Sequence, residues 1–216
     1  MVVAQRYRSC SRFTRHYVRA KLARDPVHRD ILALAAEEKF GRVVDVGCGR
    51  GQLSVALLQA GLADAALGLD CNVDRLVEAA RAGAGLNFAT RAQDFVVDPS
   101  IPEADTVLLV DVLYQLAPAA QAALLDSAAH AATSRILIRT LDPERGARSW
   151  ITRGVERLFR RVLPNSGALV QPQPVAWLRE VLEERGFAVA VVPCWRGTVL
   201  ANVLLVARRS GMVGSS

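Results

Sequence analysis

Glycine and aspartate residues gather where one short apolar run ends near position 45. Val43–Val46 contains Asp45 and is followed by glycines at alternate positions: Gly47, Gly49 and Gly51. Such glycines let the backbone turn tightly and let a ligand approach it closely, and a helix that begins there offers unpaired N–H groups to an anion. The spacing differs from the Gly-x-Gly-x-x-Gly of dinucleotide-binding folds. An acidic residue before the turn suits an ammonium group better than a pyrophosphate.

Further polar residues follow the next three apolar runs. Asp70 ends the second run, where a carboxylate can accept hydrogen bonds from both hydroxyls of a ribose. Gln93 and Asp94 follow the third run, and Asp111 follows the fourth. Each carboxylate alone is equally typical of a helix cap or a turn. Because ligands bind outside the carboxyl ends of strands in open α/β sheets, their joint placement predicts one binding site.

The elements that must position these residues alternate between β-branched runs and helical patterns, which is typical of βα units around a parallel sheet. We expect strands at Val43–Val46, Ala65–Asp70, Leu86–Ala89, Asp105–Val110, Arg135–Arg139, Ala188–Val192 and Val199–Ala207. We expect helices at Gly51–Ala60, Val73–Ala82, Pro118–Ala131 and Pro174–Arg185. The last two strands lie too close in sequence for a helical crossover, so they must form an antiparallel hairpin. The prediction is an α/β, three-layer Rossmann-like fold with a seven-stranded mixed sheet, its last strand antiparallel, plus an N-terminal helical extension.

Length and composition favour one domain. The 216 residues are 51% hydrophobic, enough for one sizeable core. We expect that domain over 1–209, with a helical extension or lid over 1–40, an inserted lid segment over 141–173 and a flexible tail over 210–216. The apolar runs are too short to span a bilayer, and N-terminal arginines exclude a secretory signal, so we expect a soluble, cytoplasmic protein. Four widely spaced cysteines predict neither a metal site nor structural disulfides.

Basic residues give the chain a formal net charge of +6, and their placement is more informative than their number. Near the N-terminus they recur at helical spacing: Arg8, Arg12, Arg15 and Arg19. The expected opposite face holds Phe13, His16, Tyr17 and Ala20. A similar pattern returns in 150–163, so we expect two helices to meet over the pocket as a lid. Alternatively, the arginines form a solvated face while the aromatic side packs onto the sheet. Such a surface could also contact anionic lipid peripherally or an acidic acyl carrier protein.

The four turns resemble those of class I, Rossmann-like S-adenosylmethionine-dependent methyltransferases over roughly 43–208. The resemblance rests on Asp45-Val46-Gly47-Cys48-Gly49-Arg50-Gly51, Asp70, Ala92-Gln93-Asp94-Phe95 and Asp111-Val112-Leu113-Tyr114. It implies S-adenosyl-L-methionine as cofactor and S-adenosyl-L-homocysteine as product. The residues implied to bind the cofactor are Asp45, Gly47, Cys48, Gly49, Gly51, Asp70, Cys71, Gln93, Asp94, Phe95 and Asp111. Asp94 is expected on the adenine amino group, and Cys71 replaces a larger apolar residue beside the adenosine.

A finer resemblance involves strings from three parts of the chain, and it is to small bacterial methyltransferases of aryl polyene and xanthomonadin-type pigment biosynthesis. The strings are Ser11-Arg12-Phe13, His16-Tyr17-Val18-Arg19 and Lys21-Leu22 with Asp25-Pro26-Val27, then Ile138-Arg139 with Asp142, Gly146 and Arg148, and finally Ala201-Asn202-Val203-Leu204-Leu205-Val206. That resemblance implies secondary metabolite biosynthesis, with an aromatic or polyene, polyketide-type acyl acceptor that is free or bound to a carrier protein. An acidic carrier would then be a partner for the basic lid.

Methyl transfer from a sulfonium is an in-line displacement in which alignment and desolvation dominate, so no universal catalytic residue is required. The residues after Asp111 match neither the Asn/Asp-Pro-Pro-aromatic motif of nucleic-acid amino methylases nor the Pro-Cys pair of cytosine methylases. We therefore expect a small-molecule acceptor and no DNA. The alternatives are an RNA methyltransferase whose arginines contact phosphate, and a non-catalytic, partner-binding protein with this fold.

The acceptor side is less well defined. The candidates for a substrate pocket are Tyr17, Tyr114, Arg139, Asp142 and Arg148. His16 is a candidate base for a phenol. Arg139 is a candidate for binding a substrate carboxylate, with an ion pair to Asp142 as the alternative. The other two histidines, His28 and His130, are expected to be peripheral. The acceptor atom, the substrate and the oligomeric state are left open.

Overall fold

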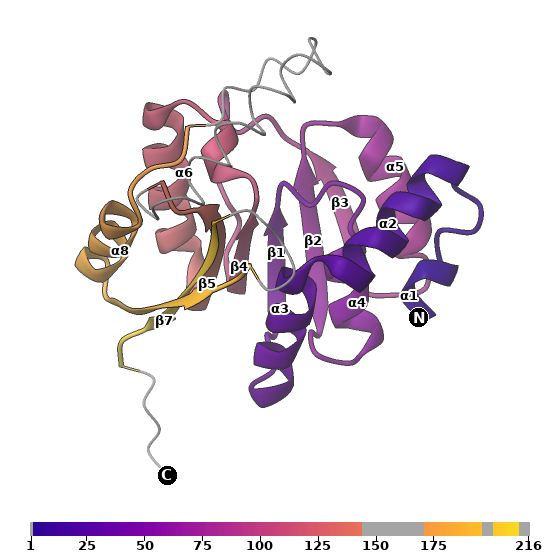
Figure 1. Cartoon of the computed structure of the whole chain (residues 1–216), viewed down its shortest axis with the longest axis horizontal. Helices are drawn as coiled ribbons and strands as arrows, with labels where there is room; N and C mark the ends of the chain where they lie inside the picture. The colour runs from indigo at the N-terminus through magenta and orange to yellow at the C-terminus, as the bar shows by residue number, and fades with distance from the viewer. Residues whose placement is uncertain (1, 144–170, 196–200, 212–216) are drawn as a thin grey trace.

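A central seven-stranded sheet organises the computed structural model, which describes residues 2–143, 171–195 and 201–211 (Figure 1). The strand order is β3-β2-β1-β4-β5-β7-β6. The strands are β1 (Arg42–Val46), β2 (Ala65–Asp70), β3 (Phe88–Ala92), β4 (Ala104–Val110), β5 (Ala132–Leu141), β6 (Phe187–Pro193) and β7 (Asn202–Arg209). β1 to β5 are parallel, and β7 runs antiparallel to both β5 and β6. The predicted mixed Rossmann-like sheet is therefore confirmed.

Helices cover both faces of the sheet because the strands are apolar on both sides. Val44 and Val46 of β1 belong to a core that α6 (Pro118–Ala131) and α8 (Val175–Glu184) close. Val43, which points the other way, packs in a second core with α3 (Pro26–Glu37) and α4 (Gln52–Gln59). α5 (Val73–Ala82) lies against β2, β3 and α4. This three-layer packing fixes the carboxyl ends of β1, β2 and β4, where the site lies.

The N-terminal extension is helical, as predicted, and is packed onto the domain. It comprises α1 (Val2–Gln5), α2 (Arg12–Arg24) and α3. Ser11 caps α2 by accepting a hydrogen bond from the Thr14 amide, and Asp25 caps α3 just before Pro26. Tyr7 and Val18 are fully buried. The extension is therefore part of the fold (Figure 1).

Several predicted bounds differ from the structure. β3 begins and ends two to three residues later than predicted, because this half-exposed edge strand carries Thr90 and Arg91 rather than an apolar run, and pairing with β2 sets its limits. β5 continues to Leu141 through its pairing with β7. The predicted start of the last strand at 199, most of the inserted segment and the end of the tail lie outside the described residues. Across the parts of the chain that are described, no helix is long and apolar enough to cross a membrane.

Candidate cofactor and acceptor site

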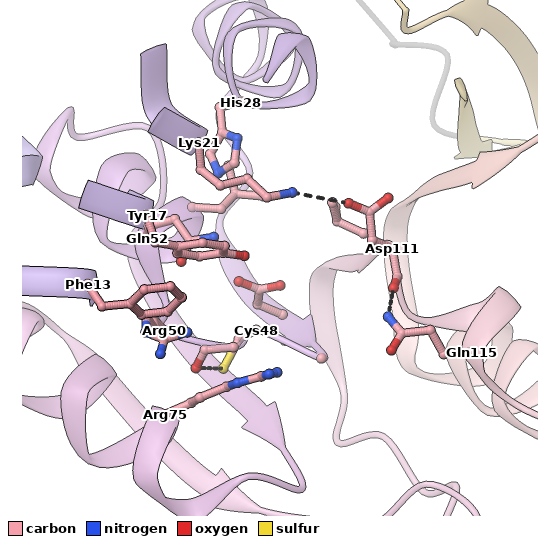
Figure 2. Close-up of a pocket in the computed structure, with 15 residues that line it drawn as sticks. Phe13, Tyr17, Lys21, His28, Cys48, Arg50, Gln52, Arg75, Asp111 and Gln115 are labelled. Carbon is pink, nitrogen blue, oxygen red and sulfur yellow. Dashed lines mark hydrogen bonds and ion pairs between the residues drawn. The ribbon is translucent and has the colours of Figure 1, made fainter. Parts of the chain in front are cut away.

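A cleft of about 290 Å³ opens at the carboxyl ends of β1 and β4 (Figure 2). Its floor is the glycine-rich turn after β1, with Asp45, Gly47, Cys48 and Gly49. One wall comes from α2 and α3, and the facing wall comes from residues just after β4, including Asp111. The cleft lies at the position where open α/β sheets bind ligands.

The glycine turn leaves one position open to the cleft. Gly47, Gly49 and Gly51 all have φ between 57° and 71°, a backbone conformation that favours glycine. A Cβ on Gly47 would meet Val112 at 2.9 Å, whereas a Cβ on Gly49 would meet no atom within 4 Å. The backbone at Gly49 is therefore bare toward the cleft, so that a ligand can approach it closely.

Asp70 supports this turn from the end of β2. Its Oδ2 accepts a hydrogen bond from the Gly49 amide at 2.8 Å, and its Oδ1 accepts one from the Asn72 amide at 2.8 Å. The carboxylate is buried, whereas the neighbouring Cys71 is exposed, and neither residue is among those that line the cleft. Asp70 therefore shapes the turn, and its oxygens retain lone pairs for further donors such as ribose hydroxyls.

Asp45 is a buried carboxylate on the cleft floor. Its Oδ2 accepts a hydrogen bond from Ser54 Oγ at 2.6 Å. Burial raises the pKa of Asp45 to about 6, and the Ser54 hydrogen bond opposes that rise only in part. A cation beside this carboxylate would stabilise its charged form. The buried acid and the bare Gly49 backbone therefore fit the ammonium and carboxylate ends of S-adenosylmethionine, which supplies an electrophilic methyl group when it is bound.

The turn after β3 is built differently from the prediction. The Gln93 side chain is buried, and its Nε2 donates to the carbonyl oxygens of Asp98 and Ser100 at 2.9 Å and 2.7 Å. Asp94 Oδ1 accepts from the Val96 amide, and Phe95 packs in the core. None of the three predicted residues lines the cleft, because their polar groups shape their own loop and the phenyl ring is taken up by the core.

The N-terminal extension is fastened to the glycine turn through Arg50. Its guanidinium lies 5.2 Å from the ring centre of Tyr17 and 5.8 Å from that of Phe13. Arg50 Nε lies 2.7 Å from Glu78 Oε2 on α5, and the Tyr7 hydroxyl donates to the Arg50 carbonyl oxygen. Tyr17 and Phe13 both line the cleft. Tyr17 was among the residues predicted for the substrate pocket, whereas Phe13 was not. The N-terminal extension is thus anchored to the glycine turn itself.

Four charged groups form a closed ring at the other side of the cleft. Arg139 Nη1 lies 2.6 Å from Asp25 Oδ1, and Arg139 Nε lies 3.3 Å from Asp111 Oδ1. Lys21 Nζ lies 2.9 Å from Asp25 Oδ2 and 3.6 Å from Asp111 Oδ2. Opposite charges alternate around the ring, which joins the junction of α2 and α3 to the ends of β4 and β5. Figure 2 shows Lys21 reaching across the opening toward Asp111.

The ring changes the expected role of Arg139. Burial alone would raise the pKa of Asp25, but Arg139 and Lys21 hold it well below its usual range. Arg139 is itself buried, pairs with Asp25 and Asp111, and is not among the residues that line the cleft. Its placement therefore favours internal ion pairs over the predicted contact with a substrate carboxylate. The partners in these ion pairs are Asp25 and Asp111, whereas the sequence had suggested Asp142.

The remaining predicted residues are dispersed. His16 does not reach the cleft, because on α2 it points the same way as Arg12 and Arg19 and lines a separate groove. Tyr114 is half-buried outside the cleft lining, and burial and the Asp111 carboxylate raise the pKa of its hydroxyl. The Asp142 amide donates to the Ala201 carbonyl oxygen, at the end of β5. Arg148 and the predicted helix over 150–163 lie outside the described residues.

Several residues that line the cleft were not among the predicted site residues. The polar and charged ones are Lys21, His28, Arg50, Gln52, Arg75 and Gln115, and the apolar ones are Phe13, Leu53 and Val110. His28, which we expected to be peripheral, is buried in the cleft wall. Asp25 carried a usable local signal, since an aspartate followed by proline is typical of a helix start. No local pattern marks His28 itself.

Comparisons with known proteins agree with this geometry. Residues 14–191 match the family model described as a methyltransferase domain. Magnesium protoporphyrin IX methyltransferase from Synechocystis PCC 6803, solved with S-adenosylhomocysteine, is 24% identical with a TM-score of 0.69, over 95% of this chain and 94% of that one. The pyocyanin biosynthetic protein PhzM is 22% identical with a TM-score of 0.66, over 95% of this chain and 61% of that one.

A third similar structure is an O-methyltransferase family protein from Burkholderia thailandensis. It is 16% identical with a TM-score of 0.66, over 91% of this chain and 59% of that one. No curated protein sequence matches the chain. The family match spans most of the chain and includes the glycine turn, Asp70 and Asp111. The chain therefore belongs to the methyltransferase domain family, and it is an S-adenosylmethionine-dependent methyltransferase with a Rossmann-like fold.

Proposed function

We propose that the enzyme methylates a small aromatic or polyene-type acyl metabolite that an acidic acyl carrier protein presents. The observation that carries the acceptor class is the aromatic wall of the cleft. The rings of Phe13 and Tyr17 lie 6.4 Å apart at an interplanar angle of 20°. Phe13 is 70% exposed, although it lines the cleft. An exposed ring at a cleft suits a flat conjugated acceptor.

Structures of similar fold support a small-molecule acceptor. Two of them are named for magnesium protoporphyrin IX and for pyocyanin biosynthesis. The cleft agrees with this, since it is small and lies between α2 and the end of β4. A small cleft with an aromatic wall favours a compact ligand.

The carrier protein is proposed from a groove on the other side of α2. This arginine groove has a volume of about 900 Å³ and an apolar part formed by residues such as Val3, Leu22 and Leu32. Its basic residues are Arg8, Arg12, Arg15, Arg19 and Arg24, and no acidic residue is among the described residues that line it. Unbalanced arginines beside apolar surface are complementary to an acidic protein. One helix, α2, therefore separates the proposed docking surface from the cleft.

A comparison of free and carrier-linked acceptors tests this proposal. We expect replacement of Arg8, Arg12, Arg15 and Arg19 by Gln to lower kcat/KM for an aryl acyl group on an acidic carrier, chiefly through slower association. Turnover of the same aryl acid in free form should be unaffected. The effect should shrink as ionic strength rises, because salt screens exposed charges.

A matched variant separates the groove from overall charge. Replacement of Arg29, Arg81, Arg179 and Arg208 by Gln removes the same charge from exposed positions outside the groove. This control should keep the wild-type ratio of kcat/KM between the carrier-linked and free acceptors. Equal ratios for wild type and both variants at low and high salt would rule out carrier docking at this groove.

A further inference from the structure

We infer that His28 is a catalytic residue, whose imidazole accepts the proton of a hydroxyl group on the acceptor. The inference deepens the proposed function, on which it rests, by naming the chemical class of the acceptor group. It starts from an unusual feature of the cleft wall. The His28 side chain is 3% exposed, and in the described part of the chain neither ring nitrogen has a hydrogen-bond partner.

Buried polar groups in proteins nearly always have a hydrogen-bond partner, so the two unpaired nitrogens of the His28 imidazole need an explanation. A histidine that only filled space would leave both ring nitrogens buried without a partner, which costs stability. His28 lines the cleft together with Gly49 and Asp111, and Figure 2 labels His28 and Asp111 among the lining residues. A group bound in the cleft is therefore the available partner for the ring nitrogens.

The backbone that carries the His28 imidazole is also held firmly. His28 lies in the first turn of α3, and its backbone amide donates to the Asp25 carbonyl oxygen. Asp25 in turn is fixed by Arg139 and Lys21 in the charged ring. A group that must meet a reacting atom benefits from such rigid support.

Its surroundings keep the imidazole neutral. The charged groups that act on it are Asp25 and Lys21 at the junction of α2 and α3, and Arg139 on β5. Burial, together with Lys21 and Arg139, lowers the pKa of His28 to about 4, although Asp25 opposes them. A neutral imidazole accepts a hydrogen bond from an O–H group but offers no charge to a carboxylate. The acceptor group is accordingly a hydroxyl, such as that of a phenol or an enol.

The proton balance of the transfer supports this assignment. As the acceptor oxygen forms its bond to the methyl carbon, the bond between that carbon and sulfur breaks and its electron pair stays on sulfur. The O–H proton then passes to the free ring nitrogen of His28, which later releases it to water. The attacking oxygen becomes strongly acidic as it gains the methyl group. A base of low pKa is therefore sufficient to take the proton.

Nitrogen NMR of the histidine side chains tests the contact directly. The protein is labelled with ¹⁵N-histidine and saturated with S-adenosylhomocysteine, and its three histidines are assigned with single Gln variants. Phenol and anisole serve as probes, because they share a shape but only phenol donates a hydrogen bond. We expect phenol to shift the unprotonated ring nitrogen of His28, anisole to leave it unchanged, and exposed His130 to respond to neither.

Turnover supplies the second measurement. For hydroxyl acceptors, we expect His28→Gln to lower kcat by about 100-fold or more, the range of a lost proton acceptor. Affinity for S-adenosylhomocysteine should stay within about twofold, and His130→Gln should match wild type. A His28 resonance unmoved by phenol, or a kcat loss below about threefold, would overturn the inference alone. Failure of the wild-type protein to bind S-adenosylhomocysteine would overturn the proposed function as well.

Discussion

Arg139 Nη1 lies 2.6 Å from Asp25 Oδ1, and this contact joins two residues 114 positions apart in the sequence. Arg139 belongs to β5, whereas Asp25 ends α2 and begins α3. Their side chains are 6% and 10% exposed. The pair therefore fixes the N-terminal extension to the sheet at the side of the cleft where Lys21 and Asp111 complete the ring.

Removal of the charge on Asp25 should be costly. Asp25→Asn keeps a side-chain oxygen that can cap α3 but leaves the buried Arg139 with Asp111 alone. Loss of one partner of a buried pair destabilises proteins by about 3–5 kcal/mol. We expect a loss toward the lower end of that range in urea denaturation, because Asp111 still compensates in part.

The neighbouring surface pair supplies the control for that measurement. Arg29 and Asp30 lie 3.0 Å apart with side chains 63% and 27% exposed. Exposed pairs contribute about 0–1 kcal/mol. Asp30→Asn should therefore change stability little. Similar losses for Asp25→Asn and Asp30→Asn would show that the ring does not hold the extension in place.

Alanine at two glycines should separate backbone strain from ligand contact. Gly49 and Gly61 have φ of 57° and 68°, and a Cβ on either would meet no atom within 4 Å. Each substitution should cost about 1–2 kcal/mol of stability, from the positive φ alone. Only Gly49→Ala should weaken binding of S-adenosylhomocysteine, measured by calorimetry, since only Gly49 faces the cleft. Equal binding by both variants would place the ligand away from the turn.

His28 should make the fold sensitive to acid. Its pKa is lowered from 6.5 to about 4 on folding, so between these values the unfolded chain binds more protons than the native one. Stability from this group is therefore complete above pH 6.5 and falls as the pH drops toward 4. At pH 5 the loss amounts to about 2 kcal/mol.

Phenylalanine at position 28 removes this titration. We expect His28→Phe to gain about 2 kcal/mol relative to wild type when denaturation is compared at pH 7.5 and pH 5. The two proteins must be compared at each pH, because Asp45 also titrates. Its raised pKa makes the free energy of unfolding fall as the pH rises, and it does so equally in wild type and in His28→Phe. Parallel stability curves for wild type and His28→Phe would mean that the histidine is not buried in neutral form.

The fold was predictable because its signals are local. The bounds of β2, α5 and α6 agree with the sequence pattern, since apolar periodicity and clear start and stop residues coincide there. β3 was misplaced because an edge strand needs no apolar face, and only pairing with β2 fixes its limits. The faces of α2 were assigned wrongly for His16 and Ala20, because arginine spacing does not show which side meets the domain.

The site was predictable only where its geometry is encoded within a few residues. The glycine turn and Asp70 follow from a single βαβ unit, and the structure brings them together at Gly49. The charged ring joins Lys21 and Asp25 at the junction of α2 and α3 to Asp111 and Arg139 at the ends of β4 and β5. Lys21 and Asp25 are only four residues apart, but no spacing in the sequence reveals their pairing with Asp111 and Arg139. Gln93 shows why a local pattern can mislead. It follows a strand, as ligand-binding residues do, but its side chain hydrogen-bonds to the backbone of its own loop.

Titration of S-adenosylhomocysteine into the protein tests the central claim most directly. Wild type should show saturable binding at one site, and Asp70→Ala should bind more weakly by about 1.5–3 kcal/mol, roughly 10- to 150-fold. Asp98→Ala, which removes an exposed carboxylate that caps the loop after β3, is the matched control and should bind as wild type does. Absence of saturable binding by wild type, or equal affinity of wild type and Asp70→Ala, would contradict the placement of the methyl donor on the glycine turn.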